Sequence, residues 1–142
     1  MAALLGMAVV LTLPFGYALD QLLGRRRSGG QVLFVVVTAY FGSAAAAYVC
    51  GGAILVMMPA RLPIAAADAG MILILAGLMA LIHFVVAFGL HRRARGGQIG
   101  ALALATGGAI AAVLLLGQQP TWAGAALALN AALIVATISL EP

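Results

Sequence analysis

The sequence predicts an all-α integral membrane protein, a bundle of five transmembrane helices that form a single domain with short loops. Three observations predict this class. First, 65% of the 142 residues are hydrophobic and only 7% are charged, with a mean hydropathy of +1.21. Second, the apolar residues fall into five long runs. Third, six of the seven basic residues lie in two of the gaps between those runs. Soluble domains are about half apolar and about a quarter charged, so we expect lipid rather than water to surround this chain.

The five runs define the expected helices. A bilayer core of about 30 Å needs about 20 helical residues, and each run is long enough to cross it. The first run has no charged side chain before Asp20 and so lacks the basic start of a secretory signal, which favours a retained membrane anchor. Helices are favoured over barrel strands because the runs are continuously apolar rather than alternating. The expected helices cover residues 1–19, 31–58, 64–90, 99–117 and 121–140.

Two features of this organisation leave alternatives open. The fourth and fifth runs meet at residues 117–120 and could instead form one re-entrant hairpin, although each is long enough to span alone. Residues 25–31 resemble residues 92–98, because both segments combine three arginines with a Gly-Gly-Gln ending and lead into an apolar helix. This similarity indicates a parallel repeat of helical hairpins, with its axis along the membrane normal. The alternative is that turns of arginine and glycine recur without duplication.

The arginines predict how the chain is threaded. With five spans, the gaps after the first and third helices lie on the same side of the membrane, and the positive-inside rule assigns that side to the cytoplasm. We therefore expect a multi-pass protein of the inner (cell) membrane with its N-terminus outside and its C-terminus in the cytoplasm. The anionic membrane surface, rather than nucleic acid, is the expected partner of these side chains. The topology-determining residues are Arg25, Arg26, Arg27, Arg92, Arg93 and Arg95.

Three polar residues are candidates for ligand binding, proton transfer or contact between helices. His83 lies about two turns from the end of the third expected helix, where an ionisable group is a functional hypothesis by default. It could relay protons, bind a quinone headgroup or ligate haem, or it could be a neutral imidazole bonded to a carbonyl. Asn130 lies near the centre of the fifth helix and could bind a ligand or join two helices. Asp20 could form a salt bridge with Arg25 or with the second arginine cluster, or it could pair with a substrate or a proton.

Small residues at four-residue spacing predict close contacts between helices. Such stripes are Ser43/Ala47/Gly51, Ala103/Gly107/Ala111 and Gly124/Ala128/Ala132/Ala136. The Ala128/Ala132 edge lies almost opposite Asn130 on the fifth helix, so one of these two faces is expected to pack within the subunit and the other to offer the amide.

Reactive groups are scarce in comparison. Cys50 is the only cysteine, and no two carboxylates lie on a common expected helix face. We therefore expect neither an enzyme, nor a metal site, nor a cofactor.

The resulting functional hypothesis is a structural or accessory subunit that packs against other membrane subunits, against copies of itself and against lipid. The first alternative is a small oligomeric transporter or channel that uses His83, Asn130 and Asp20. The second alternative is a redox-accessory subunit that binds quinone or haem through His83.

Overall fold

The computed structural model describes residues 14, 16–18, 29–57 and 66–140, with side chains from residue 68 in the last of these ranges. Within this part of the chain, 92% of the structure is helical and none is a strand. Four helices among the described residues are long and apolar enough to cross a membrane. They are α2 (Gly29–Met57), α3 (Ala66–His91), α4 (Arg95–Leu115) and α5 (Pro120–Ile138). The all-helical prediction is therefore confirmed for the described residues.

The expected helix boundaries are close to the observed ones, with one informative difference. The expected helix at residues 1–19 lies mostly outside the described residues, so the count of five spans stays a prediction. The other expected ranges, 31–58, 64–90 and 121–140, differ from α2, α3 and α5 by at most two residues at each end. The exception is α4, which begins four residues before the expected position 99. The Gly-Gly pair at 96–97 was expected in the loop, but it forms the first turn of the helix.

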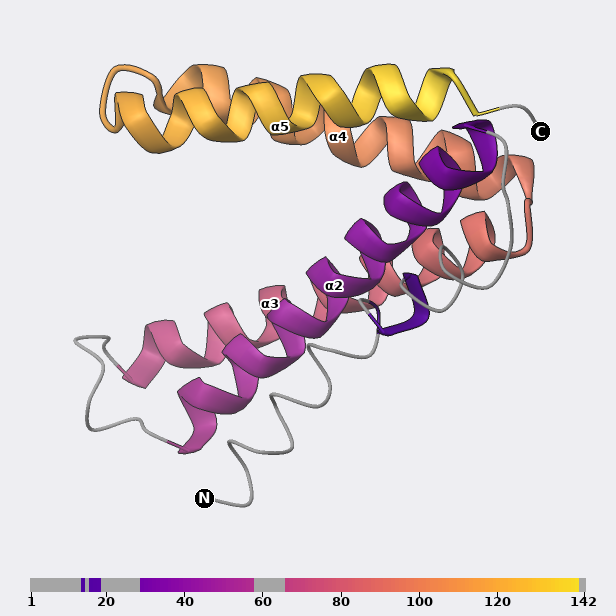
Figure 1. The fold of residues 1–142 in the computed structure, drawn as a ribbon. Coiled ribbons are helices and arrows are strands. Elements are labelled where there is room, and N and C mark those ends of the chain that lie inside the picture. The colour runs from indigo at the N-terminus through magenta and orange to yellow at the C-terminus, as the bar shows by residue number, and fades with distance from the viewer. Residues whose placement is uncertain (1–13, 15, 19–28, 58–65, 141–142) are drawn as a thin grey trace.

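The four helices form two hairpins that meet at one end and diverge toward the other (Figure 1). α2 packs against α3, and α4 packs against α5, with more limited contacts between α3 and α4 and between α2 and α5. Both hairpins begin at the end where Arg92, Arg93 and Arg95 lie, which we call the apex. The diverging parts are called the arms. Both hairpins therefore have the orientation that a parallel repeat requires, although duplication itself stays a prediction.

The apex contains the hydrophobic core that joins all four helices. Leu90 of α3 and Ala101 of α4 are both completely buried, and Phe41 of α2 is only 1% exposed. The Gln98 side-chain amide also donates a hydrogen bond of 3.3 Å to the Leu140 carbonyl just beyond α5. The core residues are Val37, Phe41, Val86, Leu90, Ala101 and Leu140.

A tight turn between α3 and α4 makes this apex possible. Arg93 has φ 54°, the left-handed conformation that often ends a helix. Its N–H donates to the Leu90 carbonyl at 2.7 Å, and the N–H of Ala94 donates to the Gly89 carbonyl at 2.8 Å. These bonds satisfy carbonyls that α3 would otherwise leave unpaired at its end. The chain is thus free to enter α4 directly at Arg95.

Glycine allows the two helices to approach closely after this turn. A methyl group built on Gly97 would overlap the backbone of Gly89 and Leu90, and one on Gly89 would lie 2.9 Å from the Gly97 Cα. One turn further on, a methyl group on Gly100 would lie 2.7 Å from Val86 Cγ2. Because helices in lipid gain little from burying apolar surface, such close backbone contact is a main source of their association.

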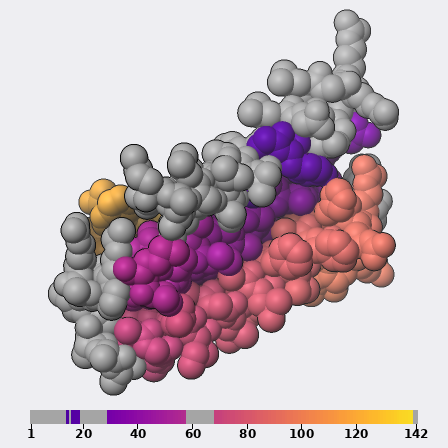
Figure 2. All heavy atoms as spheres, turned by 90° about the horizontal axis from the view of Figure 1, so that it is seen from below, coloured from indigo at the N-terminus to yellow at the C-terminus, as the bar shows by residue number. Residues whose placement is uncertain are grey.

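The α2–α3 hairpin remains closely packed away from the apex. Its side chains form a continuous surface along both helices in the space-filling view (Figure 2). Near the far end, Gly52 of α2 faces Leu73 and Ala76 of α3, and Gly52 is buried. Each hairpin is therefore a packed unit, and the divergence lies between hairpins.

Candidate functional site

A hollow between the two hairpins brings together the two polar residues that the sequence singled out on α3 and α5. It has a volume of about 430 Å³, within the size range of small-molecule sites. His83 is eight residues before the end of α3, and Asn130 is eight residues before the end of α5. Both therefore lie about 12 Å along their helices from the apex end. The lining residues are Tyr40, Tyr48, Met79, His83, Ala103, Leu104, Gly107, Gly108, Ala111 and Asn130.

The geometry of His83 defines which of its nitrogens faces a ligand. The side chain is 8% exposed, and Nδ1 lies 2.8 Å from the Met79 carbonyl oxygen. A carbonyl only accepts, so Nδ1 carries the proton and donates it. In the neutral imidazole Nε2 is then a hydrogen-bond acceptor. Nε2 has no hydrogen-bond partner among the described residues.

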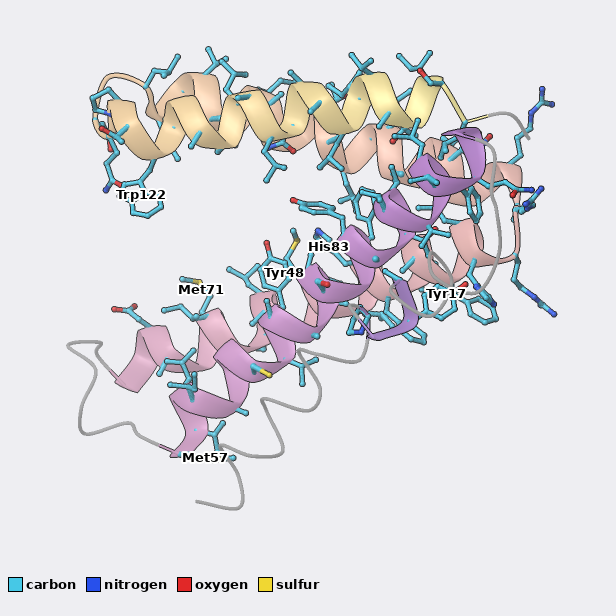
Figure 3. All side chains as sticks on the ribbon, viewed as in Figure 1. Tyr17, Tyr48, Met57, Met71, His83 and Trp122 are labelled. Atoms are coloured by element: carbon cyan, nitrogen blue, oxygen red, sulfur yellow. The ribbon has the colours of Figure 1, made fainter. Side chains whose placement is uncertain are left out.

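Aromatic rings hold the imidazole in place. The Tyr48 ring centroid lies 5.2 Å from that of His83, and the Phe41 centroid lies 5.9 Å away, with both rings tilted. Figure 3 shows Tyr48 and His83 side by side at the inner side of the α2–α3 hairpin. Packing on two sides and the bond to Met79 restrict the orientation of the ring, so its free nitrogen is pre-positioned.

Asn130 contributes an amide from the opposite hairpin. Its Nδ2 donates a hydrogen bond of 2.8 Å to the Ala126 carbonyl, one turn earlier in α5. The amide lies directly against α4, because a methyl group built on Gly108 would be 2.5 Å from Asn130 Oδ1. The absence of a side chain at Gly108 thus makes room for this amide. One Nδ2 hydrogen and the Oδ1 acceptor are left without a partner in the described structure.

The small-residue stripe of α5 packs only in part against the described residues, since Ala136 contacts the core at the apex. Ala128 and Ala132 are exposed, and the face of α5 that carries Asn130 is the one turned to α4. The Ala128/Ala132 edge is therefore not a face of α5 that packs against the described residues of this chain, whereas the opposite face does offer the Asn130 amide to the hollow. The three α4 residues Ala103, Gly107 and Ala111 line the hollow instead. The small residues of α4 that are buried are Gly97, Ala101, Ala105 and Ala112.

The charged candidates lie away from the hollow. Asp20 and residues 25–27 fall outside the described residues. At the apex, the guanidinium of Arg92 lies 5.3 Å from the Phe88 ring centroid and that of Arg93 lies 5.3 Å from the Phe34 centroid. Arg95 is the first residue of α4. These arginines therefore surround the turn and do not reach the polar site.

A second and larger hollow, about 670 Å³, lies on another side of the α2–α3 hairpin. It is almost entirely apolar, and His91 and Tyr17 at its edge share a hydrogen bond of 2.9 Å with each other. His91 is thus separate from His83, and the two histidines do not form one ligand pair. Size alone favours this hollow, but its lining offers few polar groups, whereas His83, Asn130 and two tyrosines line the smaller hollow, which is therefore the better candidate for a polar ligand.

Sequence reasoning missed most of the partners of His83 and Asn130. Tyr40 and Tyr48 are eight residues apart on α2, a spacing that places both near one side of the helix. That spacing could have grouped the two tyrosines. The glycine pair at 107 and 108 could not have been assigned to Asn130, since only the pairing of α4 with α5 brings them together.

The described residues contain no group of three or more histidine, cysteine, aspartate or glutamate side chains able to hold a metal ion. No protein-family model, curated protein or solved structure matches this chain. The geometry of the hollow and of the arms is therefore the basis for inferring a function.

Proposed function

We propose that this chain is a non-catalytic subunit of a membrane complex or homo-oligomer, a multi-pass protein whose diverging hairpins receive further transmembrane helices. The four apolar helices support the first part of this proposal. In the most apolar windows of α3, α4 and α5 only 17% of the residues are buried within the chain, against 33% for α2. Most of the helix surface is thus available to lipid or to other subunits.

The observation that carries the proposal is the exposure of the inner sides of the arms. Met71 near the start of α3 is 58% exposed, and Trp122 near the start of α5 is 77% exposed. Both side chains extend into the space between the arms (Figure 3). Helices in lipid associate through dispersion contacts and close packing, so inner faces that lack partners among the described residues are suited to helices from another polypeptide.

The arginines give the proposed orientation. By the positive-inside rule, Arg92, Arg93 and Arg95 support an orientation with the apex at the cytoplasmic surface of the inner membrane, and the arginines at 25–27 in the sequence support the same side. Five spans then leave the N-terminus outside and the C-terminus inside. Reporter tags at the two ends test this threading: we expect them to report from opposite compartments, and a common compartment contradicts it.

A photo-crosslinking experiment tests the subunit proposal. Benzoylphenylalanine replaces Met71 or Trp122, and in a control variant it replaces Val135, which is 65% exposed and on nearly the opposite side of α5 from Trp122. Irradiation in native membranes is expected to give adducts with another polypeptide, or with a second copy, from the two arm positions more than from Val135. Strictly monomeric protein with no adduct from either arm position contradicts the proposal.

A second candidate function is a small oligomeric transporter or channel, and the polar hollow between the hairpins is the observation that favours it. His83 and Asn130 are the groups that would contact a solute or proton there, with Asp20 as the third expected contributor. Reconstitution in liposomes tests this function. A solute- or pH-dependent flux that falls in His83→Ala and Asn130→Ala supports the transporter function. A flux that is unchanged by both substitutions contradicts it.

A redox-accessory role through His83 is the third candidate. Its haem version has a direct test, since purified protein with bound haem has a Soret absorption band and protein without haem has none. His91 cannot supply a second axial ligand beside His83, because it lies about 12 Å further along α3 and lines the other hollow.

A further inference from the structure

We propose that the hollow between the hairpins binds an uncharged, planar, lipid-soluble molecule that bears ring hydroxyls, of the quinol class. The ligand donates a hydroxyl hydrogen to His83 Nε2. This inference concerns a small ligand near the apex and does not depend on which helices pack between the arms.

The charge of the ligand follows from the lining. None of the described residues that line the hollow is an aspartate, glutamate, lysine or arginine. A charged ligand would lose its hydration without gaining a counter-charge, which is costly in an apolar environment. The arginines lie at the apex end, about 12 Å from His83 along α3. A neutral ligand is therefore the one that this lining accommodates.

The polarity of the ligand follows from His83. Its Nδ1 proton is committed to the Met79 carbonyl at 2.8 Å, so Nε2 is an acceptor that needs a donor. A ligand hydroxyl that donates to Nε2 satisfies this acceptor while the ligand covers it. Asn130 offers a free N–H and a carbonyl oxygen on the facing wall, and Tyr40 and Tyr48 add two phenols. A molecule with two ring oxygens can engage both walls.

The shape of the ligand follows from α4. Of the five α4 residues that line the hollow, Ala103, Gly107, Gly108 and Ala111 carry little or no side chain and the fifth is Leu104, while Tyr40 and Tyr48 line the same hollow from α2. A methyl group built on Gly107 meets no atom within 4 Å, so α4 borders open space here rather than a packed contact. A planar ring suits a hollow lined by small residues and aromatic side chains. The volume of about 430 Å³ suits one such headgroup.

The chain offers a direct spectroscopic test, because it contains only two histidines. Protein labelled with ¹⁵N in its histidines, in lipid nanodiscs, is titrated with octylhydroquinone. We expect a saturable shift of the His83 Nε2 signal and none of the His91 signal, with assignment from a His91→Phe variant. The dimethyl ether of octylhydroquinone has no O–H donor and is the matched ligand control, for which no shift is expected.

Two glycine variants test the location without removing a polar group. Gly107→Leu projects into the hollow, whereas Gly124→Leu lies on α5 outside it, and a methyl group at either glycine meets no atom within 4 Å. Gly107→Leu fills the hollow and is expected to weaken octylhydroquinone binding about tenfold or more. His83→Phe removes the acceptor of the ligand hydroxyl, and we expect a loss of similar size. Gly124→Leu is expected to bind as the parent does.

Three results would overturn the proposal. They are no saturable shift of His83, equal binding of the dimethyl ether, and unchanged binding by Gly107→Leu. Since the titration uses the unaltered chain, it remains decisive even if a variant does not fold. Failure here leaves the arm cross-links untouched, so it is distinguishable from failure of the subunit proposal.

Discussion

The apex and the arms are built from similar apolar residues but are held together differently. At the apex, Leu90 and Ala101 are fully buried, and the backbones of Gly89 and Gly97 come into direct contact. On the arms, Leu114 is 75% exposed and Trp122 is 77% exposed. Hydrophobicity alone therefore does not determine which helix surfaces of this chain pack together. Close backbone approach at glycine and the short capped turn between α3 and α4 determine which surfaces pack.

The largest effect is expected from adding one methyl group at the tightest contact of the apex. Gly97→Ala places its Cβ on the backbone of Gly89 and Leu90, which cannot rotate away, so we expect a loss of about 3 kcal/mol in the free energy of unfolding. Titration with dodecyl sulfate, followed by circular dichroism, measures this loss. The neighbouring Gly96→Ala is the control, because a methyl group there meets no atom within 4 Å. Equal stability of the two variants contradicts the close α3–α4 contact.

Removing side-chain volume is expected to destabilise the protein more at the apex than on the arms. Leu90→Ala leaves a cavity in the core that joins the four helices, and we expect a loss of about 2 kcal/mol or more. Leu114→Ala changes a side chain that is 75% exposed, and the purified monomer should lose less than about 0.5 kcal/mol. The same titration measures both variants. A larger loss from Leu114→Ala than from Leu90→Ala means that the apex is not the core.

The turn itself is tested by two substitutions at one position. Arg93 has φ 54° and its guanidinium lies over the Phe34 ring. Arg93→Ala removes the cation–π contact and keeps the left-handed strain, whereas Arg93→Gly removes both. The glycine variant should therefore be more stable than the alanine variant by about 1 kcal/mol. Identical unfolding free energies argue against the left-handed cap.

The smallest effect is expected at the wall of the hollow. Gly108→Ala displaces the Asn130 amide, which can move because it is the end of a side chain, so stability should change by less than about 1 kcal/mol. The amide ¹⁵N signal of Asn130, however, should shift as its bond to Ala126 is disturbed. In Gly107→Ala, which meets nothing within 4 Å, the signal should move little. A signal that is equally unmoved in both variants contradicts the placement of Asn130 against Gly108.

Sequence reasoning recovered the helices because they depend on local composition. Four long apolar runs between turn residues leave little choice of secondary structure, and α2, α3 and α5 follow the expected ranges closely. The start of α4 was placed four residues late because Gly-Gly usually marks a loop. Here Gly97 is helical, and its missing side chain admits the backbone of α3.

The arrangement of helices was harder to predict, for a physical reason. Small residues occur on nearly every face of α4 and α5, so spacing alone does not select the face that packs. The stripe with Ala128 and Ala132 was chosen, but the Asn130 face packs against α4. His83 and Asn130 were identified from polarity within apolar runs. Their convergence on one hollow depends on the α3–α4 turn, which no local pattern specifies.

One distance measurement tests the divergence of the hairpins most directly. Spin labels are attached at Met71→Cys and Trp122→Cys in a Cys50→Ala background, and double electron–electron resonance is recorded in bilayers diluted with unlabelled protein. A control pair, Leu114→Cys with Trp122→Cys, spans the packed α4–α5 hairpin. The arms are predicted to give a clearly longer distance than the control pair. A Met71–Trp122 distance as short as that of the control pair, as in helices packed about 8–10 Å apart, would contradict the open arms on which the proposed subunit function rests.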